Sequence, residues 1–312
     1  MKKEQINIRD PFVVWENEKY YLYGTRAKDF GSRTGGFDVY ISENLIDWSE
    51  PVECFDSEKY GLNDGVNWAP EVHKYKEKYY MFATFTQKNG LHGTYSLCAD
   101  SLMGPFVPCS KGALTPNEWE CLDGTLYVDE EGVPYLIFCH EHTQIKDGTI
   151  CYARLNESLS AIDGDIVTLF CASSYKLVDP IKVDHYVTDG PFMYRSKSGG
   201  LFMIWSSFIA GRYAEFVIKF KGGRLGLEFE HMEPLLDSDG GHGMIFSDVK
   251  NTYFIYHTPN KSLFERPEFC LIDDNGDSIG LYRMLQDRLG AYLNVNGSQH
   301  RRKPLPYSPA LR

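Results

Sequence analysis

NIRDPFVVWENEKYYLYGT, residues 7–25, holds a pattern that the rest of the chain repeats. A carboxylate stands before a proline (Asp10-Pro11), and an apolar run, a polar turn at 16–19 and an aromatic run follow. Two apolar runs joined by a few polar residues are typical of a β-hairpin. Four later segments show the same order of parts, and they open with Trp68-Ala69-Pro70-Glu71, Leu122-Asp123-Gly124, Thr188-Asp189-Gly190 and Gly241-His242-Gly243.

The repeats predict an all-β fold. Their spacing of roughly 50 to 65 residues is slightly longer than the period of a propeller blade and too long for helical repeats. Each unit continues with a third and often a fourth strand-like run, without a helical period between them. We therefore expect a five-bladed β-propeller with four antiparallel strands per blade. Stacked hairpins in a β-sandwich are the alternative, but they leave unexplained why each repeat opens with a functional-looking side chain.

Composition bounds the domain organisation and the partners. The 312 residues contain no Ser/Gly/Pro-rich linker, so a single propeller domain over 1–312 is expected, with a short basic tail at about 299–312. The formal net charge of −11 argues against nucleic acid and against anionic membrane surfaces, because both need clustered Lys and Arg. The basic residues 300–303 are interpreted as a solvated tail.

The N-terminal residues and the cysteines indicate a cytoplasmic protein. Residues 1–5 run into the first repeat without an apolar signal region, and no apolar run has membrane-spanning length. The eight cysteines are scattered without a CxxC pair, so we interpret them as reduced, small apolar residues.

The residues that open the repeats are expected to meet. The innermost strands of propeller blades begin at the same end of the central channel, so these side chains should point into a common funnel. A ring that only seals the channel with waters or an ion is the structural alternative. Carboxylates that converge on one pocket must differ in pKa, and carboxyl pairs with separated pKa values are what glycoside hydrolysis requires. The five residues are Asp10, Glu71, Asp123, Asp189 and His242.

The order of these motifs carries a family resemblance over essentially the whole chain. The chain resembles family 43 glycoside hydrolases, five-bladed propellers that act with inversion on arabinose- and xylose-containing polysaccharides and oligosaccharides. The motifs are Arg9-Asp10-Pro11, Trp68-Ala69-Pro70-Glu71-Val72, Leu122-Asp123-Gly124-Thr125-Leu126, Gly241-His242-Gly243 and His257-Thr258-Pro259-Asn260.

The resemblance implies catalytic roles. Asp10 would be the general base that activates water, and Asp123 the carboxylate that raises the pKa of the acid and orients it. The family's acid is a glutamate in a Glu-Gly-Pro motif, where this sequence has Asp189-Gly190-Pro191. Aspartate is shorter, and an inverting pair stands about 6.5–9.5 Å apart. We favour Asp189 by position and keep Glu141, expected where the second strand of the third blade ends on the same face, as the alternative acid or as a sugar ligand.

His242 has a structural and a functional interpretation. A lone histidine is most often a packed or hydrogen-bonded core residue. By resemblance it helps to hold a hydrated calcium ion in the central channel through bound water, because calcium prefers oxygen ligands. No organic cofactor is expected, since the sequence has no P-loop, dinucleotide fingerprint or G-x-S-x-G motif. Residues 140–142, His-Glu-His, lack the further ligands of a zinc site, and residues 273–277 are interpreted as a hairpin turn.

Candidates for the pocket walls are less specific. Trp68 is a candidate stacking platform for a pentose ring, with blade packing as the alternative, and Glu71 would bind the sugar or support Trp68. By resemblance, Arg266 would contact a sugar hydroxyl. The remaining candidates lie in loops or at a strand end expected on the same face: Phe30, His92 and Trp205.

The sequence therefore predicts an inverting exo-glycosidase that releases terminal α-L-arabinofuranosyl residues from arabinoxylan or arabinan oligosaccharides. A β-D-xylosidase acting on xylo-oligosaccharides is the nearest alternative. From other classes, a non-catalytic sugar-binding propeller and a structural interaction propeller remain. The sequence does not determine the oligomeric state.

Overall fold

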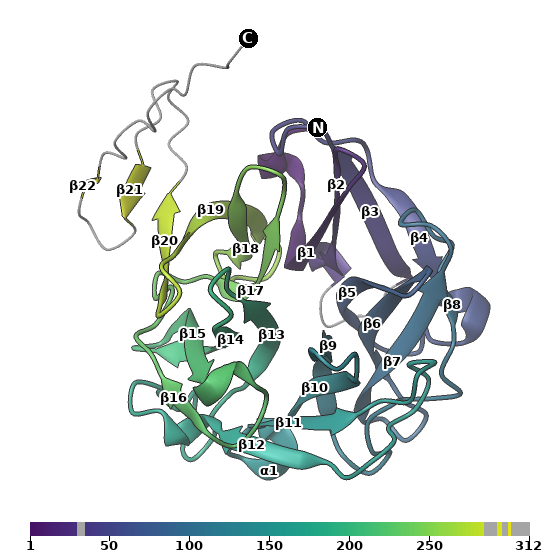
Figure 1. The fold of residues 1–312 in the computed structure, drawn as a ribbon. Coiled ribbons are helices and arrows are strands. Elements are labelled where there is room, and N and C mark those ends of the chain that lie inside the picture. Colours follow the sequence, from purple (N-terminus) through teal and green to yellow (C-terminus); the bar gives the residue numbers. More distant parts are fainter. Residues whose placement is uncertain (30–34, 284–291, 295–298, 301–312) are drawn as a thin grey trace.

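Each of the five sequence repeats folds into one antiparallel sheet, and the five sheets surround a central axis (Figure 1). The computed structural model describes residues 1–29, 35–283, 292–294 and 299–300; for Asp29, Arg283 and the last two stretches it describes the backbone alone. The predicted five-bladed β-propeller is confirmed. Residue Phe30 and residues 301–312 of the expected basic tail lie outside the described part of the chain.

The strands of each blade follow one another in chain order from the axis outward. Blades 1 and 2 comprise β1 (Ile8–Glu16), β2 (Lys19–Arg26), β3 (Gly36–Ser42), β4 (Val52–Asp56) and β5 (Asn67–Tyr75), β6 (Lys78–Thr86), β7 (His92–Ala99), β8 (Val107–Pro108). Blades 3 and 4 comprise β9 (Cys121–Val128), β10 (Pro134–His140), β11 (Thr149–Arg154), β12 (Val167–Cys171) and β13 (Asp189–Arg195), β14 (Leu201–Ile209), β15 (Arg212–Phe220), β16 (Phe229–His231).

Blade 5 has two additional outer strands. It comprises β17 (Gly241–Ser247), β18 (Thr252–Thr258), β19 (Arg266–Asp274), β20 (Ile279–Arg283), β21 (Tyr292–Asn294) and β22 (Gln299–His300). Helices in the described residues are short: η1 (Lys3–Gln5), η2 (Ala27–Asp29), η3 (Glu58–Tyr60), α1 (His142–Ile145), η4 (Ala172–Ser174) and η5 (Lys221–Gly223). None of them is long and apolar enough to span a membrane.

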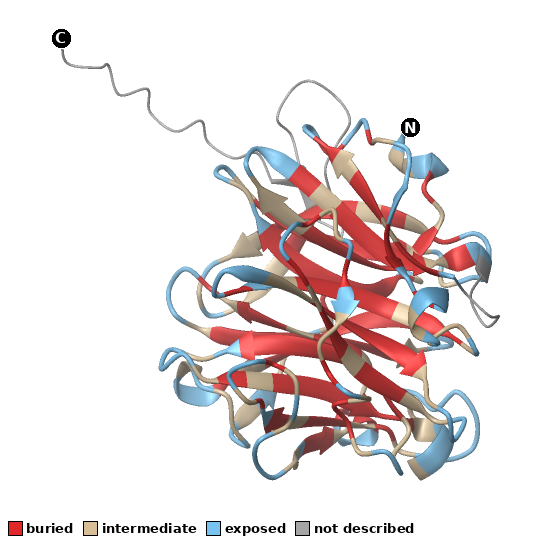
Figure 2. Ribbon diagram, turned by 90° about the vertical axis from the view of Figure 1, so that its right-hand side faces the viewer, coloured by how far each residue is buried: buried red, intermediate tan, exposed pale blue. Residues whose placement is uncertain are grey.

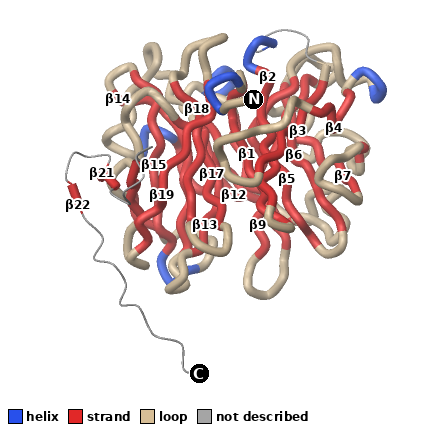
Figure 3. The backbone as a smooth tube through the Cα atoms, turned by 90° about the horizontal axis from the view of Figure 1, so that it is seen from above, coloured by secondary structure: helices blue, strands red, loops and turns tan. Residues whose placement is uncertain are grey.

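The strands of the blades are largely buried: Figure 3 shows them as the main part of the molecule, and Figure 2 shows that most of their length is buried. The buried apolar side chains of the described residues form clusters that each join two adjacent blades. The cluster between blades 3 and 4, for example, packs Ile137 of β10 against Met203 of β14. Alternating apolar residues along each strand can serve both interfaces because successive side chains point to opposite faces of the sheet.

The innermost strand of every blade bulges at one equivalent position. Two residues of this strand face a single residue of the second strand, and the first of the two has a positive φ angle. Such bulges re-aim side chains and are frequent beside active sites. The five positive-φ residues are Asp10 (φ 50°), Ala69 (φ 47°), Asp123 (φ 55°), Gly190 (φ 49°) and His242 (φ 48°).

The five bulge residues form a ring around the axis, one from each blade. Their positions correct the sequence alignment of the repeats in two blades. Ala69 of blade 2 is equivalent to Asp10, and Glu71, which had been aligned with it, lies two residues farther along β5. In blade 4 the equivalent residue is Gly190, so Asp189 is equivalent to Arg9, one residue before the bulge. The side chains of Asp10 and Asp189 therefore leave the backbone from different positions of the repeat.

Side chains on the second strands hold this ring together from blade to blade. At four of the five interfaces between neighbouring blades, the backbone N–H of the bulge residue donates to a side chain on the second strand of the preceding blade. This side chain occupies the same position of the repeat in each case. These acceptors are Thr25 Oγ1 for Ala69 (2.7 Å), Thr84 Oγ1 for Asp123 (3.0 Å), Ser206 Oγ for His242 (2.6 Å) and His257 Nδ1 for Asp10 (3.2 Å). At the remaining interface, between blades 3 and 4, the N–H of Gly190 donates to Asp123 Oδ2 at 3.0 Å.

Blades 1 and 5 close the ring by packing and polar contacts, and the sheet orders place no strand of one blade in the sheet of the other among the described strands. The Arg9 guanidinium donates to Glu265 Oε1 at 2.8 Å across this interface. Arg266 Nε donates to the backbone carbonyl of Glu4 in η1 at 2.8 Å. The contact between His257 and Asp10 lies at the same interface, so the closure of the propeller also sets the backbone of Asp10.

Candidate active site

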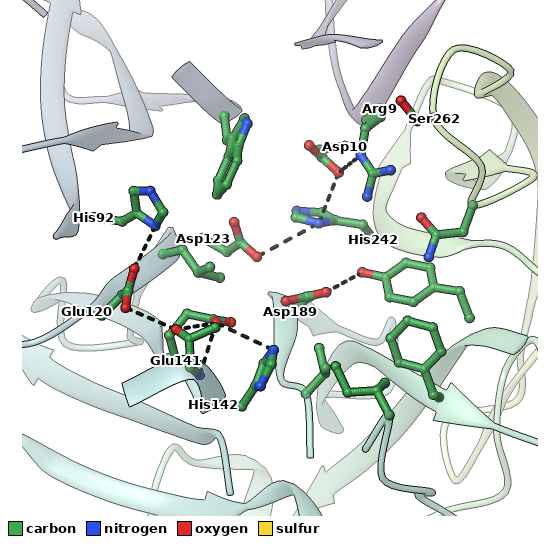
Figure 4. A pocket seen from close by; sticks show the side chains of 18 residues that line it. Arg9, Asp10, His92, Glu120, Asp123, Glu141, His142, Asp189, His242 and Ser262 are labelled. Atoms are coloured by element: carbon green, nitrogen blue, oxygen red, sulfur yellow. Dashed lines mark hydrogen bonds and ion pairs between the residues drawn. The ribbon is translucent and has the colours of Figure 1, made fainter. Parts of the chain in front are cut away.

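A pocket of about 480 Å³ opens where the innermost strands begin, and residues of all five blades line it (Figure 4). Its volume falls within the range of about 300–1,000 Å³ that is usual for small-molecule sites. The predicted site residues that line it are Asp10, Trp68, His92, Asp123, Glu141, Asp189 and His242. The sequence repeats thus bring segments that are far apart in the chain to one cavity.

Asp10 is a buried carboxylate with cationic and hydroxyl neighbours. Its Oδ2 accepts from Thr25 Oγ1 at 2.7 Å, and its Oδ1 lies 3.1 Å from His242 Nδ1 and 3.9 Å from Arg9 Nε. Burial alone would raise the pKa of Asp10, but the charges of His242 and Arg9 and the Thr25 hydroxyl outweigh it, so the pKa is lowered. Asp10 is therefore the ionised carboxylate of the pocket.

The two histidines next to Asp10 have opposite charge states. Burial disfavours the charged form of His242, but the carboxylates of Asp10, Asp123 and Asp189 raise its pKa to about 9. Burial and the charge of Arg9 lower the pKa of His257 to about 3. His257 is therefore neutral, as it must be for Nδ1 to accept the Asp10 N–H, while His242 carries the positive charge beside Asp10.

Asp123 and Asp189 lie on the other side of His242. Burial raises the pKa of Asp123 to about 7, and the charges of Asp189 and Asp10 add to this effect while His242 opposes it. Burial also raises the pKa of Asp189, whose Oδ2 accepts from the Tyr213 hydroxyl at 2.9 Å. Asp123 Oδ2 is tied to the Gly190 N–H at 3.0 Å, so it sits directly against the segment that carries Asp189.

Glu141 is the second candidate acid and faces the pocket from the segment between β10 and α1. Its backbone N–H donates to the carbonyl of Glu120 at 2.8 Å, which places the two glutamates side by side. Burial raises the pKa of Glu141 to about 8, and the negative charge of Asp189 raises it further; donors of Thr143 act in the opposite direction. A carboxyl with this pKa holds its proton at neutral pH and is suited to a general acid.

Two predicted wall residues lie in the pocket and contact each other. The rings of Trp68 and His92 have centroids 4.9 Å apart at an interplanar angle of 56°. His92 Nδ1 also lies 3.1 Å from Glu120 Oε1. Both side chains are partly exposed, so an indole face is available at the wall; a stacking role for Trp68 stays a prediction.

Three predicted wall residues do not line the pocket. Trp205 is completely buried in the core between Phe170 and Phe216, because β14 continues to Ile209 and does not end near residue 205 as assumed; Phe208 of this strand reaches the pocket instead. Arg266 is held by the carbonyls of Glu4 and Glu265 at the closure between blades 1 and 5.

Glu71 is also away from the pocket. It is buried on β5, and its Oε2 lies 3.1 Å from His73 Nε2. Its position two residues beyond the bulge explains the difference, since the bulge residue and the one before it are those that face the funnel. The sequence interpretation of Glu71 as a sugar ligand or a support for Trp68 is therefore not borne out by its contacts.

Several pocket residues were not singled out from the sequence. Arg9 had a detectable signal, since it precedes the bulge just as Trp68, Leu122 and Asp189 do. Tyr213 lies on the third strand of its blade, and no repeat position marks it. The other pocket residues without a sequence prediction are Glu120, Leu122, His142, Thr143, Ile181, Val187, Phe208, Asn260 and Ser262.

The expected calcium ion can be compared with the residues around His242. Among the described residues, no group of three or more His, Cys, Asp or Glu side chains is arranged to bind a metal directly. An ion would therefore be held through water, as calcium often is in part. His242 Nδ1 faces Asp10, and Nε2 could accept from such a water only if the ring lost the proton that the neighbouring carboxylates favour; the ion would then supply the positive charge near Asp10 in place of the imidazolium. Calcium stays a prediction.

Comparisons with known proteins agree with the fold. Residues 5–275 match the model of glycosyl hydrolases family 43. Among curated proteins, none matches the sequence significantly. The crystal structure of an endo-arabinase from Bacteroides thetaiotaomicron VPI-5482 has 35% sequence identity and a TM-score of 0.78, and the match covers 86% of this chain and 95% of that one.

Two further solved structures, both less than 25% identical in sequence, resemble this chain in fold. A thermostable family-43 glycoside hydrolase has 23% identity and a TM-score of 0.77, with 97% of each chain covered. An endo-1,4-β-xylanase from Bacteroides thetaiotaomicron VPI-5482 has 21% identity and a TM-score of 0.74, with 90% of this chain and 95% of that one covered. The family model over most of the chain and the 35% identical relative establish the family. The chain belongs to glycosyl hydrolase family 43 and is a glycoside hydrolase.

Proposed function

We propose that the protein is an inverting exo-acting α-L-arabinofuranosidase that removes terminal arabinofuranose from arabinan or arabinoxylan oligosaccharides. The observation on which this proposal depends is the separation of pKa values in one pocket. The pKa of Asp10 is lowered, whereas those of Asp189 and Glu141 are raised. Carboxyl groups driven apart in this way take the roles of base and acid in glycoside hydrolysis.

Asp10 acts as the base in this proposal. Its ionised carboxylate takes a proton from a water molecule, and that water attacks the anomeric carbon from the face opposite the leaving group. The Thr25 hydroxyl and the His242 ring fix the two carboxylate oxygens, so the base is oriented before the substrate binds. The positive charge of His242 keeps Asp10 ionised in a buried site.

A protonated carboxyl opposite the base donates to the glycosidic oxygen as the bond to the anomeric carbon breaks. Asp189 and Glu141 are both in place for this role, since both line the pocket and both have raised pKa values. Asp123 lies between these groups and His242, and its negative charge raises the pKa of Glu141. In this proposal Asp123 supports the acid electrostatically, which is the role that the resemblance implies for it.

The shape of the pocket favours cleavage at a chain end. Described residues of all five blades line it, so the pocket is a funnel at the axis with walls from every blade and is open at its mouth. A cavity of about 480 Å³ with such a rim accommodates the end of a sugar chain. A substrate cut in its interior would need an open groove with two exits.

Internal cleavage of arabinan is the second candidate. The 35% identical relative from Bacteroides thetaiotaomicron is described as an endo-arabinase. This relative also supports arabinose over xylose as the released sugar.

The products formed from a linear α-1,5-linked arabinopentaose separate these candidates. An exo-enzyme releases arabinose and arabinotetraose first, whereas an endo-enzyme releases arabinobiose and arabinotriose. Proton NMR of the first turnovers should show the β-anomer, because inversion converts the α-linkage. Retention of configuration would contradict the proposal. Release of 4-nitrophenol from a β-D-xylopyranoside but not from an arabinofuranoside would contradict it as well.

A catalytically impaired variant controls for background activity and for pure binding. Asp10→Asn removes the base with little change in volume and should lower kcat by about 10²–10⁴-fold, the usual contribution of acid–base groups. If wild type and variant bind arabino-oligosaccharides equally and neither releases sugar, the protein is a binding propeller and the hydrolase proposal is wrong.

A further inference from the structure

The carboxyl groups of Glu120 and Glu141 lie near each other at the wall of the pocket (Figure 4), and one hydroxyl group lies between them. Thr143 Oγ1 lies 3.0 Å from Glu120 Oε2 and 3.1 Å from Glu141 Oε2. Both distances are within the range of hydrogen bonds between oxygens or just above it. The three residues lie in two segments, residues 118–120 before β9 and residues 141–145 after β10.

The protons available at this bridge limit its arrangement. A threonine hydroxyl has one proton to donate and two lone pairs to accept with. It can donate to one of the two glutamates, and the contact with the other is favourable only if that glutamate carries a proton and donates to the hydroxyl oxygen. Both contacts are fully satisfied when the pair Glu120 and Glu141 carries one proton.

The surroundings place this proton on Glu141. Glu120 Oε1 lies 3.1 Å from His92 Nδ1, and the Glu120 side chain is more exposed than that of Glu141, so Glu120 has the donor and the solvent that an anion needs. Glu141 is buried and faces the negative charges of Asp189 and Asp123. The hydroxyl of Thr143 then donates to Glu120 and accepts from Glu141 while Glu141 holds its proton. The Thr143 donors that lower the pKa of Glu141 act on its ionised form: the backbone N–H, 3.5 Å from Glu141 Oε2, and the hydroxyl once it has turned.

We propose that Glu141 is the proton donor of the reaction and that Thr143 and Glu120 are positioning residues that hold it protonated between turnovers. In the reaction Glu141 gives one proton to the leaving oxygen as the bond to the anomeric carbon breaks, and it becomes a carboxylate. The Thr143 hydroxyl then turns to donate to this carboxylate, while Glu120 keeps its contact with His92. The inference rests on the proposed function for the reaction that consumes the proton.

Other titratable groups also face Glu141. They are the same in all the variants proposed below, so their effect on the pKa of Glu141 is common to these variants. His142 Nε2 lies 3.6 Å from Glu141 Oε2, and the pKa of His142 is lowered by burial and by the charges of His185 and Lys182. The groups around Glu141, besides Glu120 across Thr143, are His142, Asp189, Asp123, Cys121 and Cys139.

The sign of a pKa change tests the bridge. In Thr143→Val, Glu141 loses the acceptor of its proton, so its pKa should fall by about one unit, the value of one modest hydrogen bond. Glu120→Gln should also lower it, because the amide can donate to the Thr143 oxygen and free the hydroxyl to donate to the Glu141 carboxylate. Thr143→Ser keeps the hydroxyl and should leave the pKa within a few tenths of a unit.

Two measurements read this pKa. Carbon-13 NMR titration of glutamate carboxyl groups, with the Glu141 signal identified by its absence in Glu141→Gln, needs no turnover. The basic limb of the kcat/KM profile should move down by the same amount in Thr143→Val and in Glu120→Gln. If Thr143→Val leaves the pKa unchanged or raises it, the hydroxyl donates to Glu141 in the resting enzyme and the inference is wrong.

The leaving group tests the role of Glu141 as donor. Glu141→Gln should lose at least about 10²-fold on an arabino-oligosaccharide and far less on a 4-nitrophenyl arabinofuranoside, since an activated leaving group needs little protonation. Equal losses on both substrates would exclude Glu141 as the donor, while the function itself would stand. A wild type that hydrolyses neither substrate refutes the proposed function, and the NMR titration then still decides whether the bridge holds the proton.

Discussion

The contact between Arg9 and Glu265 predicts a large loss of stability when the arginine is removed. Glu265 is completely buried between blades 1 and 5, and its Oε1 accepts from Arg9 Nη1 at 2.8 Å. Breaking a buried ion pair by removing one partner costs about 3–5 kcal/mol, because the other charge stays buried. Arg9→Met keeps the apolar stem of the side chain, so this cost comes mainly from the stranded carboxylate.

The expected change in melting temperature follows from the length of the chain. An unfolding entropy of about 2.1 cal/mol/K per residue gives about 0.66 kcal/mol/K for 312 residues. A loss of about 3–5 kcal/mol then lowers the melting temperature by about 5–8 °C. Urea unfolding followed by tryptophan fluorescence gives the same free energy independently, provided that the m-value is unchanged.

A double-mutant cycle isolates the pair. Glu265→Leu removes the partner carboxylate, and the double variant Arg9→Met/Glu265→Leu should recover much of the stability lost in Arg9→Met, because replacing both charges by apolar groups is often nearly neutral. Arg9 also lines the pocket, but Glu265 does not, and unfolding is measured without substrate, so the coupling energy of the cycle reports on the contact at the closure. If the two single losses add up to that of the double variant within about 0.5 kcal/mol, the residues are independent and the reasoning is refuted.

Three further predictions concern the centre of the propeller. Gly190→Ala should lower kcat/KM at least about tenfold and stability by about 1–2 kcal/mol. The reasons are the positive φ of +49° and the contact of the added Cβ, which would lie 2.7 Å from the His242 ring. Gly211→Ala, at φ +74° with open space around it, is the control for backbone strain alone. Burial raises the pKa of Glu215 to about 8. The stability of the wild type should therefore fall relative to that of Glu215→Gln as the pH rises from about 4.5 to about 8, by at most about 1.4 kcal/mol per pH unit. Thermal melts of the two proteins with equal pH slopes would contradict this. Dialysis against a chelator should lower the melting temperature and calcium should restore it, since a ligand bound to the folded state stabilises it; an unchanged melt contradicts the calcium prediction.

The repeat pattern was sufficient to predict the blades, because strand alternation and turn residues are local properties of the sequence. The hairpin at 7–25 forms as expected, with Trp15 opposite Tyr20 and Glu16 opposite Lys19. The bulge positions could not be predicted from residue type. An alanine and a glycine occupy this position in blades 2 and 4, and the neighbouring acidic residues Glu71 and Asp189 drew the alignment away from it.

The carboxylates and the imidazole of the site were predictable because the motif order fixes the end of the propeller to which they belong. Residues whose role depends on strand length or on a partner elsewhere were not. Trp205 is buried because β14 extends past it, and Arg266 binds backbone carbonyls at the closure. Thr143 and Glu120 gain their importance from a mutual distance that only the folded chain shows.

The hydrogen bond from Asp10 to His257 has a consequence for biosynthesis. Asp10 is synthesised 247 residues before the histidine whose ring nitrogen accepts its N–H. A growing chain therefore carries Asp10 long before the backbone of this residue can be set in place. If Asp10 is the base as proposed, hydrolysis should start only once the last blade has been translated and docked, and a fragment that stops short of residue 257 should fold in part but turn over no sugar.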